Sequence, residues 1–252
     1  MRCWIPALSL SLVLAAWGCA QDRAMTSIRS DLRADRVDDA VRKVDALAAT
    51  TPNSYDVQIA LATAHHRAAI RSGNERDEAG YVSHVETAFD AYTRASNLDP
   101  RRGAPHEGVA ALLLYQGDMK GALEELQIAR MIEPLDPTHT ANLAQMYVYM
   151  GRLSRARSLI EQARKEGLHP VYAETVEMLA SWREGDLVDA RDLFDLAYQQ
   201  PKVMRAFLNE FLGFFKAIRS ACVCFPIGDF ASRNFFLIFH HHLHVGAVFV
   251  DG

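Results

Sequence analysis

The histidines of this sequence are the residues whose spacing could support metal chemistry. The segment HHHLH supplies His240, His241, His242 and His244, and tracts of this kind bind zinc, nickel or copper. The segment HEGVA begins at His106 like a zinc-protease motif, but no second histidine follows four residues later. The alternative function is therefore that of a metal-binding or enzymatic protein that uses the C-terminal histidine tract. The HEGVA segment indicates no metal site.

His65 and His66 form a second histidine pair, adjacent in sequence. Adjacent residues lie about 100° apart around a helix, so these imidazoles cannot form one ligand face, and the pattern favours His65 as a packed core residue. The sequence also lacks a phosphate-binding loop, a nucleophile elbow, a Cys-x-x-Cys pair and a glycine-rich dinucleotide turn. We therefore expect a protein that is not an enzyme, with no catalytic residues, no cofactor and no metal site.

The composition is that of a globular protein without a basic excess. Half of the 252 residues are hydrophobic, 23% are charged, and the formal net charge is −4. Such a balance gives no general attraction for nucleic-acid phosphates, so we expect no nucleic-acid partner. The four cysteines, Cys3, Cys19, Cys222 and Cys224, lie only near the two ends of the chain and imply no disulfide framework.

The N-terminus has the pattern of an export signal. Arg2 precedes an apolar run from about Ala7 to Trp17, which is short for a membrane span of about 20 residues. The segment AAWGC resembles a bacterial lipobox, in which the cysteine is lipidated and becomes the mature N-terminus. This resemblance implies a signal peptide over residues 1–18, a lipid on Cys19 and an outer-membrane lipoprotein facing the periplasm. Ordinary signal cleavage, which gives a soluble periplasmic or secreted protein, is the alternative.

The elements that position these residues repeat along the chain with a period of 34. Gly117, Gly151 and Gly185 are spaced by this period. The same spacing relates two columns of alanine and one column of larger apolar residues: Ala122, Ala156 and Ala190; Ala129, Ala163 and Ala197; Leu126, Ile160 and Phe194. The columns extend backwards to Ala88, Tyr92 and Ala95 and, after 14 additional residues are allowed, to Ala40 and Val44. A period of this length indicates a solenoid.

Each repeat has the pattern of two amphipathic helices. The repeats span about 21–54, 55–102, 103–136, 137–170 and 171–204. In the fourth, Asp136 is a predicted N-cap before Pro137 at the first helical position, and Gly151 can adopt the left-handed conformation that ends the helix. We expect the alanine columns to mark the places where the two antiparallel helices of a repeat approach closely.

The residues at these columns closely resemble the tetratricopeptide repeat (TPR). The third repeat supplies the consensus positions in order, with Val109, Ala110, Leu113, Gly117, Ala122, Leu126, Ala129 and Pro134. The resemblance implies an all-α fold, a right-handed superhelical TPR solenoid over residues 19–204 with about five helix-turn-helix repeats and a partial sixth.

Three segments depart from the repeat. Residues 69–82 contain SGNERDEAG, for which we expect a solvated loop between the helices of the second repeat. Residues 205–219 are a predicted capping helix. Residues 220–252 are an irregular, apolar, histidine-containing tail, and ten of the twelve phenylalanines lie between Phe207 and Phe249. This tail is interpreted as a broken sixth repeat followed by an unrelated or frameshifted sequence, with an apolar segment docked on the solenoid end as the alternative.

The resemblance also implies a binding surface. In this family the leading helices line a concave groove that holds partner segments, and Tyr115 and Tyr149, 34 residues apart, are predicted neighbours along it. The predicted groove residues are His66, Arg67, Glu107, Tyr115, Gln145, Tyr149, Tyr172, Trp182 and Arg183. The expected function is a protein–protein interaction scaffold that binds other envelope proteins, held at the membrane by its N-terminal lipid anchor. Assistance in pilus or secretion assembly, or the organisation of cell-wall enzymes, is the more specific expectation.

Overall fold

The computed structural model describes residues 21–186, and the regular secondary structure in this range is helical. The signal peptide with Cys19, the second helix of the fifth repeat, the capping helix and the histidine-containing tail all fall outside the described residues. No helix among residues 21–186 combines the length and the apolar character needed to span a bilayer. The chain divides into two compact units, Met1–Pro100 and Arg101–Gly252, which are described in turn.

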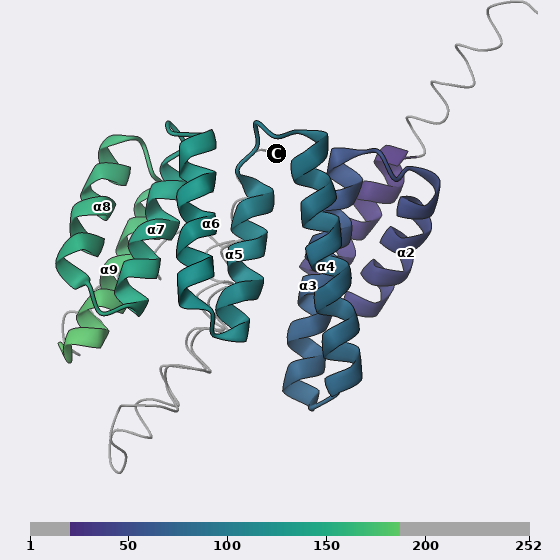
Figure 1. The fold of residues 1–252 in the computed structure, drawn as a ribbon, viewed down its shortest axis with the longest axis horizontal. Helices are drawn as coiled ribbons and strands as arrows, with labels where there is room; N and C mark the ends of the chain where they lie inside the picture. The colour runs from purple at the N-terminus through teal and green to yellow at the C-terminus, as the bar shows by residue number, and fades with distance from the viewer. Residues whose placement is uncertain (1–20, 187–252) are drawn as a thin grey trace, which may run out of the picture. The chain divides into compact units, whose positions relative to one another are not determined.

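The first unit consists of antiparallel helices that pack in sequence order (Figure 1). Residues 21–33 are helical and are followed by α2 (Val37–Thr50), α3 (Tyr55–Glu75) and α4 (Glu78–Leu98). α3 packs against both α2 and α4. The core between these helices is apolar, because their inward faces bury Ile28, Val44, Val57, Ala62 and Ala88.

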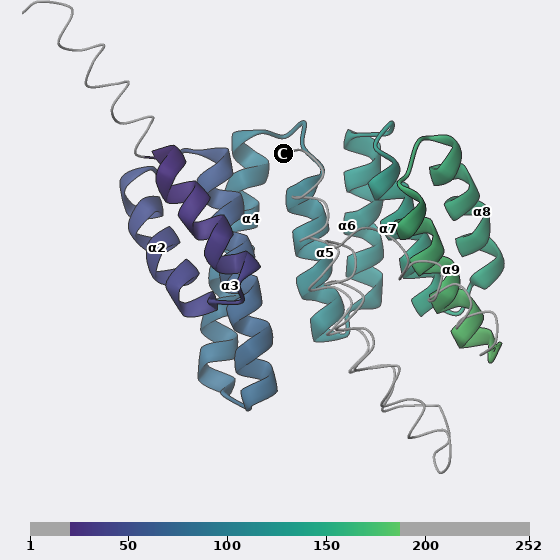
Figure 2. The same cartoon turned by 180° about the vertical axis from the view of Figure 1, so that it is seen from behind.

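The second unit repeats the same arrangement of helices (Figure 2). Its helices are α5 (Ala104–Gln116), α6 (Met119–Ile132), α7 (Pro137–Tyr149), α8 (Leu153–Lys165) and α9 (Pro170–Glu184). α5 packs on α6 and α7 on α8, which gives two helix pairs, and α7 also contacts α6 and α9. The prediction of an all-α fold built from helix pairs is therefore confirmed.

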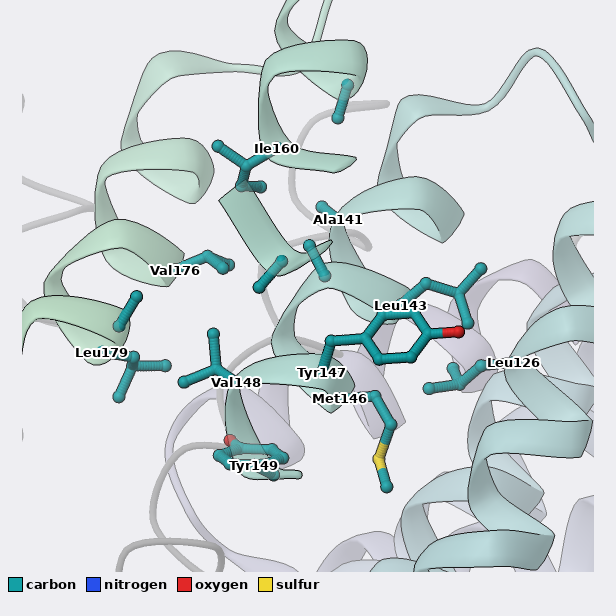
Figure 3. Close-up of a cluster of buried hydrophobic side chains, with 14 of the residues drawn as sticks. Leu126, Ala141, Leu143, Met146, Tyr147, Val148, Tyr149, Ile160, Val176 and Leu179 are labelled. Atoms are coloured by element: carbon teal, nitrogen blue, oxygen red, sulfur yellow. The ribbon is translucent and has the colours of Figure 1, made fainter. Parts of the chain in front are cut away.

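The predicted columns of small residues are buried between the helices. In the second unit, Ala122, Ala129, Ala156 and Ala163 are each at most 1% exposed. Leu126 and Ile160, from the column of larger residues, lie in the apolar cluster between α5, α6, α7, α8 and α9, around Tyr147 (Figure 3). Small side chains are needed at the alanine positions because two helices meet there, and protein interiors leave little unfilled space.

The repeated glycines have the left-handed backbone conformation that was expected at the ends of the helices. Gly117, Gly151 and Gly185 all have positive φ, between 72° and 86°. After each glycine the next backbone N–H reaches back to a carbonyl five residues earlier, as in Asp118 to Leu113 at 2.9 Å and Arg152 to Tyr147 at 2.8 Å. This is the Schellman arrangement, which satisfies carbonyls at the end of a helix. The capping role of Asp136 is also confirmed, since its Oδ1 accepts the Thr138 N–H at 2.8 Å.

The predicted loop at residues 69–82 is wrong. α3 and α4 continue through this segment and contain 21 residues each, compared with 13 in α5 and 14 in α6. The added residues form helix because they bury apolar surface: Ala69 and Ile70 are 1% and 7% exposed. Gly80 allows close packing, since a methyl group there would lie 2.9 Å from Oγ of Ser72 and closer still to the carboxylate of Asp77. We call the segment 69–84 the hairpin extension.

The turn of the hairpin extension uses the same devices as the other turns. Arg76 has a φ of 62°, and Oδ1 of Asp77 accepts the N–H of Gly80 at 3.0 Å. Gly117 occupies the equivalent left-handed position before α6, where Oδ1 of Asp118 accepts the N–H of the glycine three residues later at 2.9 Å. The spacing of Asp followed by Gly at i+3 was the signal that could have located this turn in the sequence.

Candidate functional site

The predicted groove residues all lie on the leading helices α3, α5, α7 and α9. Their exposure differs widely. His66, Arg67, Glu107, Gln145 and Tyr149 are buried, Tyr115, Tyr172 and Trp182 are half-buried, and Arg183 is exposed. The half-buried and exposed residues are therefore the members of this set that a partner can contact directly.

In the first unit, both predicted groove residues contact other helices of the unit. The ring of His66 meets the ring of Tyr92 edge-on, with 6.5 Å between centroids. The guanidinium of Arg67 donates to the carbonyl of Leu32, in the helical segment 21–33. This bond connects α3 to the first helix of the unit, so Arg67 contributes to the packing of the repeat.

In the second unit, aromatic groove residues of α7 and α9 converge on the same apolar cluster. Tyr149 belongs to the cluster (Figure 3). Tyr172 and Trp182 pack against the same cluster. The Gln145 amide donates to the Tyr149 hydroxyl at 2.5 Å. Burial raises the pKa of Tyr149, and the bond from Gln145 opposes this shift only partly. The phenol is therefore neutral and acts as an acceptor in a buried polar contact.

Glu107 is held in a buried polar network between α5 and α7. Its Oε1 lies 2.5 Å from Nδ1 of His139 and accepts the Asn142 amide at 2.6 Å. On the other side of the imidazole, Nε2 of His139 lies 3.3 Å from Oε2 of Glu133, which also accepts the Gly103 N–H at 2.5 Å. Glu107 on α5 is therefore bound to two residues of α7, His139 and Asn142.

The charges around His139 fix its protonation state. Burial alone would favour the neutral ring, but the hydrogen bond and charge of Glu107, followed by the charges of Asp136 and Glu133, outweigh it. Together they raise the pKa of His139 to about 9. An imidazolium has no free lone pair, so at neutral pH this side chain neither binds a metal nor accepts a proton. The network therefore contains a buried ion pair that joins α5 to α7.

Solved structures of other proteins are similar to the chain at low sequence identity, among them the following two. One is TTC0263, a thermophilic TPR protein of Thermus thermophilus, with a TM-score of 0.54 and 21% identity over 72% of this chain and 97% of that chain. The chain has the tetratricopeptide repeat fold. The other is PilF of Pseudomonas aeruginosa, with a TM-score of 0.53 and 16% identity over 92% of this chain and 93% of that chain. No family model and no curated protein matches the sequence.

Within this TPR fold, the HEGVA segment has a packing role that its motif did not reveal. His106 reaches Oε2 of Glu125 on α6 at 2.7 Å, while the adjacent Glu107 reaches His139 on α7. The two neighbouring side chains thus connect α5 to both following helices. His139 was missed because it lies 32 residues after Glu107, which is not the repeat period, so the self-similarity of the TPR sequence could not pair them.

The part of the TPR chain between residues 21 and 186 contains no group of three or more His, Cys, Asp or Glu side chains arranged to hold a metal ion. The histidine tract at 240–244 lies outside that range. The predicted groove positions that are not buried carry three aromatic rings and a guanidinium, on Tyr115, Tyr172, Trp182 and Arg183.

Proposed function

We propose that this chain is a non-enzymatic scaffold that binds protein partners along the leading helices of its TPR repeats. The observation that carries the proposal is the set of large side chains that remain accessible on these helices in the second unit. Tyr115, Tyr172 and Trp182 are half-buried, and Arg183 is exposed, on α5 and α9. Aromatic and arginine side chains of this kind are common anchors of protein interfaces, because they supply large contact areas and charge-assisted hydrogen bonds.

The proposed location is the cell envelope. The apolar run before Cys19 and the lipobox-like segment AAWGC support export and lipidation, which would anchor the protein in the outer membrane with its repeats facing the periplasm. Mass spectrometry of the mature N-terminus tests this proposal. A diacylated or triacylated Cys19 supports it, and an unmodified Gln21 or a free Cys19 at the N-terminus contradicts it.

The more specific proposal is assistance in pilus or secretion assembly, or in organising cell-wall enzymes. The similarity to a solved structure described as PilF of Pseudomonas aeruginosa is in keeping with the first of these. The partners would then be other envelope proteins, contacted through the accessible face of α5 and α9.

A capture experiment from envelope extracts tests the scaffold function. The full-length protein is compared with a Tyr115→Ala, Arg183→Ala double variant. Lys120→Ala on α6 is the control, because its side chain is 89% exposed and lies outside the predicted groove. We expect the double variant to lose most of the proteins that the wild type and the control retain. Equal capture by all three proteins would rule out binding through these residues.

A further inference from the structure

Three polar side chains form a continuous chain across the helices of the first unit. Oδ1 of Asp45 on α2 lies 2.9 Å from Nε2 of His65 on α3. The other ring nitrogen of His65, Nδ1, lies 3.0 Å from Nδ1 of His84 on α4. The two rings are tilted by 57° to each other, with 5.1 Å between centroids. His65 is buried and His84 is half-buried, at the base of the hairpin extension.

The position of Asp45 determines how the two imidazoles share a proton. Because the carboxylate can only accept, Nε2 of His65 must carry the hydrogen, and in the neutral ring Nδ1 of His65 is then the acceptor. His84 must therefore donate its Nδ1–H across the 3.0 Å gap, which is a normal hydrogen-bond distance. A further proton on Nδ1 of His65 would place two N–H groups against each other and remove this bond.

The charges that surround the pair come from all three helices. α2 contributes Asp38 and Asp45, α3 contributes Arg71, and Asp77 lies in the turn before α4. Asp38 is bound by both terminal nitrogens of Arg71. Burial lowers the pKa of His84, the neighbouring His65 and Arg71 lower it further, and Asp45 and Asp77 act in the opposite direction. The site therefore resists a second positive charge.

We propose that the His65–His84 pair is an acid-sensitive contact that holds the hairpin extension closed at neutral pH and loosens it when the pair takes up a second proton. The Nδ1–Nδ1 bond joins α3 to α4 where the hairpin extension begins. When this bond is lost, the two helical arms of the extension can separate. Outside the extension, the same two helices contribute to the core of the unit, where Ala62 on α3 and Ala88 on α4 are fully buried. Acid would therefore loosen the extension and leave the repeat folded.

The direction of the pH effect follows from linkage. The pKa of an unperturbed histidine is about 6.5. A histidine whose pKa is lower than this in the folded protein stabilises the fold at pH values above 6.5, and this stabilisation is lost as the pH falls below 6.5. Each proton taken up on opening changes the opening equilibrium by up to about tenfold per pH unit.

Hydrogen exchange of the full-length protein between pH 7.5 and 5.0 measures this opening. We expect the protection factors of amides at residues 69–75 and 78–83 to fall by up to about tenfold per pH unit below pH 6.5. In His84→Gln the fall should be absent, because the glutamine amide does not titrate and can either donate to the neutral His65 ring or accept from it once it is protonated. His106→Gln in α5 is the matched control, since it removes another half-buried histidine and should leave the response of α3 and α4 unchanged.

An NMR titration of the wild type provides an independent measurement if the variant does not fold. When the Cε1–H signals of both rings are followed, the signal of His84 should titrate below the ordinary histidine value of about 6.5. Independent titration of both rings near 6.5, protection factors that do not change with pH, or an unchanged acid response in His84→Gln would each overturn the proposal.

Discussion

The carboxylate of Glu107 on α5 lies 2.5 Å from Nδ1 of His139 on α7, where the two side chains are 9% and 3% exposed. These residues belong to the leading helices of successive repeats. The apolar columns provide most of the packing in the second unit, whereas this ion pair provides a directional contact. Removing one partner of a buried pair leaves an uncompensated charge, and this makes the contact sensitive to single substitutions.

Glu107→Gln should destabilise the protein by about 3 kcal/mol, because the His139 imidazolium would lose its main counter-charge. Urea unfolding followed by circular dichroism measures the change. Glu124→Gln is the matched control, since Glu124 is exposed and lies 3.7 Å from the exposed Lys120. A surface pair of this kind contributes at most about 1 kcal/mol, so a similar loss in both variants would contradict the structural role of Glu107.

The stability of the protein should fall as the pH rises from 6.5 to 9. The pKa of His139 is raised in the folded state to about 9, so its stabilising contribution is complete below pH 6.5 and is lost above 9. The shift corresponds to about 3 kcal/mol. Urea unfolding at several pH values measures the slope. In His139→Gln, which is less stable overall, this part of the pH dependence should disappear, and an unchanged slope would show that another group causes it.

Ala156→Leu should cost roughly 1–3 kcal/mol, because Ala156 is 1% exposed at the place where α8 meets α7. Thermal unfolding provides the measurement. Ser158→Leu introduces the same side chain at an exposed position of α8 and should change the stability by less than about 0.5 kcal/mol. If the two variants melt at the same temperature, the alanine column is not the site of close helix approach.

Gly117→Ala should cost about 1 kcal/mol through the backbone alone. The φ of Gly117 is 85°, and a methyl group there would meet nothing within 4 Å, so no steric clash adds to the cost. Gln116→Ala, one residue earlier in the helix and exposed, is the control. A melting temperature unchanged by Gly117→Ala would mean that the turn can relax out of the left-handed conformation.

The helix pairs could be predicted from the sequence because the repeat places the same side-chain sizes at the same positions. The alanine columns and the left-handed glycines repeat every 34 residues, and Asp136–Pro137 is a local start signal for α7. The prediction from periodicity was wrong at residues 69–82, where the chain departs from the repeat. The hairpin extension is rich in charge and glycine, and its helical conformation depends on the burial of Ala69 and Ile70, which a polar composition conceals.

The polar contacts of the interior were less predictable than the apolar columns. His65 was expected in the core and is 7% exposed, but its bonds to Asp45 and His84 span 20 and 19 residues, which no periodicity indicates. The predicted groove positions lie on the leading helices as expected, whereas their exposure depends on neighbouring side chains. Arg67 illustrates the difference, since its guanidinium bonds to the Leu32 carbonyl inside the unit. Whether the set binds a partner stays a prediction.

The equal length of α3 and α4 has a consequence for how this repeat can change in evolution. α4 is seven residues longer than α6, which corresponds to about two helical turns and carries the connecting turn about 10 Å outward. Because both arms are longer than α5 and α6 by about two whole turns, the side chains on either side of the extension keep the same facing direction. An insertion in one arm alone would rotate that arm against the other and expose its apolar stripe. Gains and losses of sequence in this repeat are therefore expected in matched segments of about seven residues per arm.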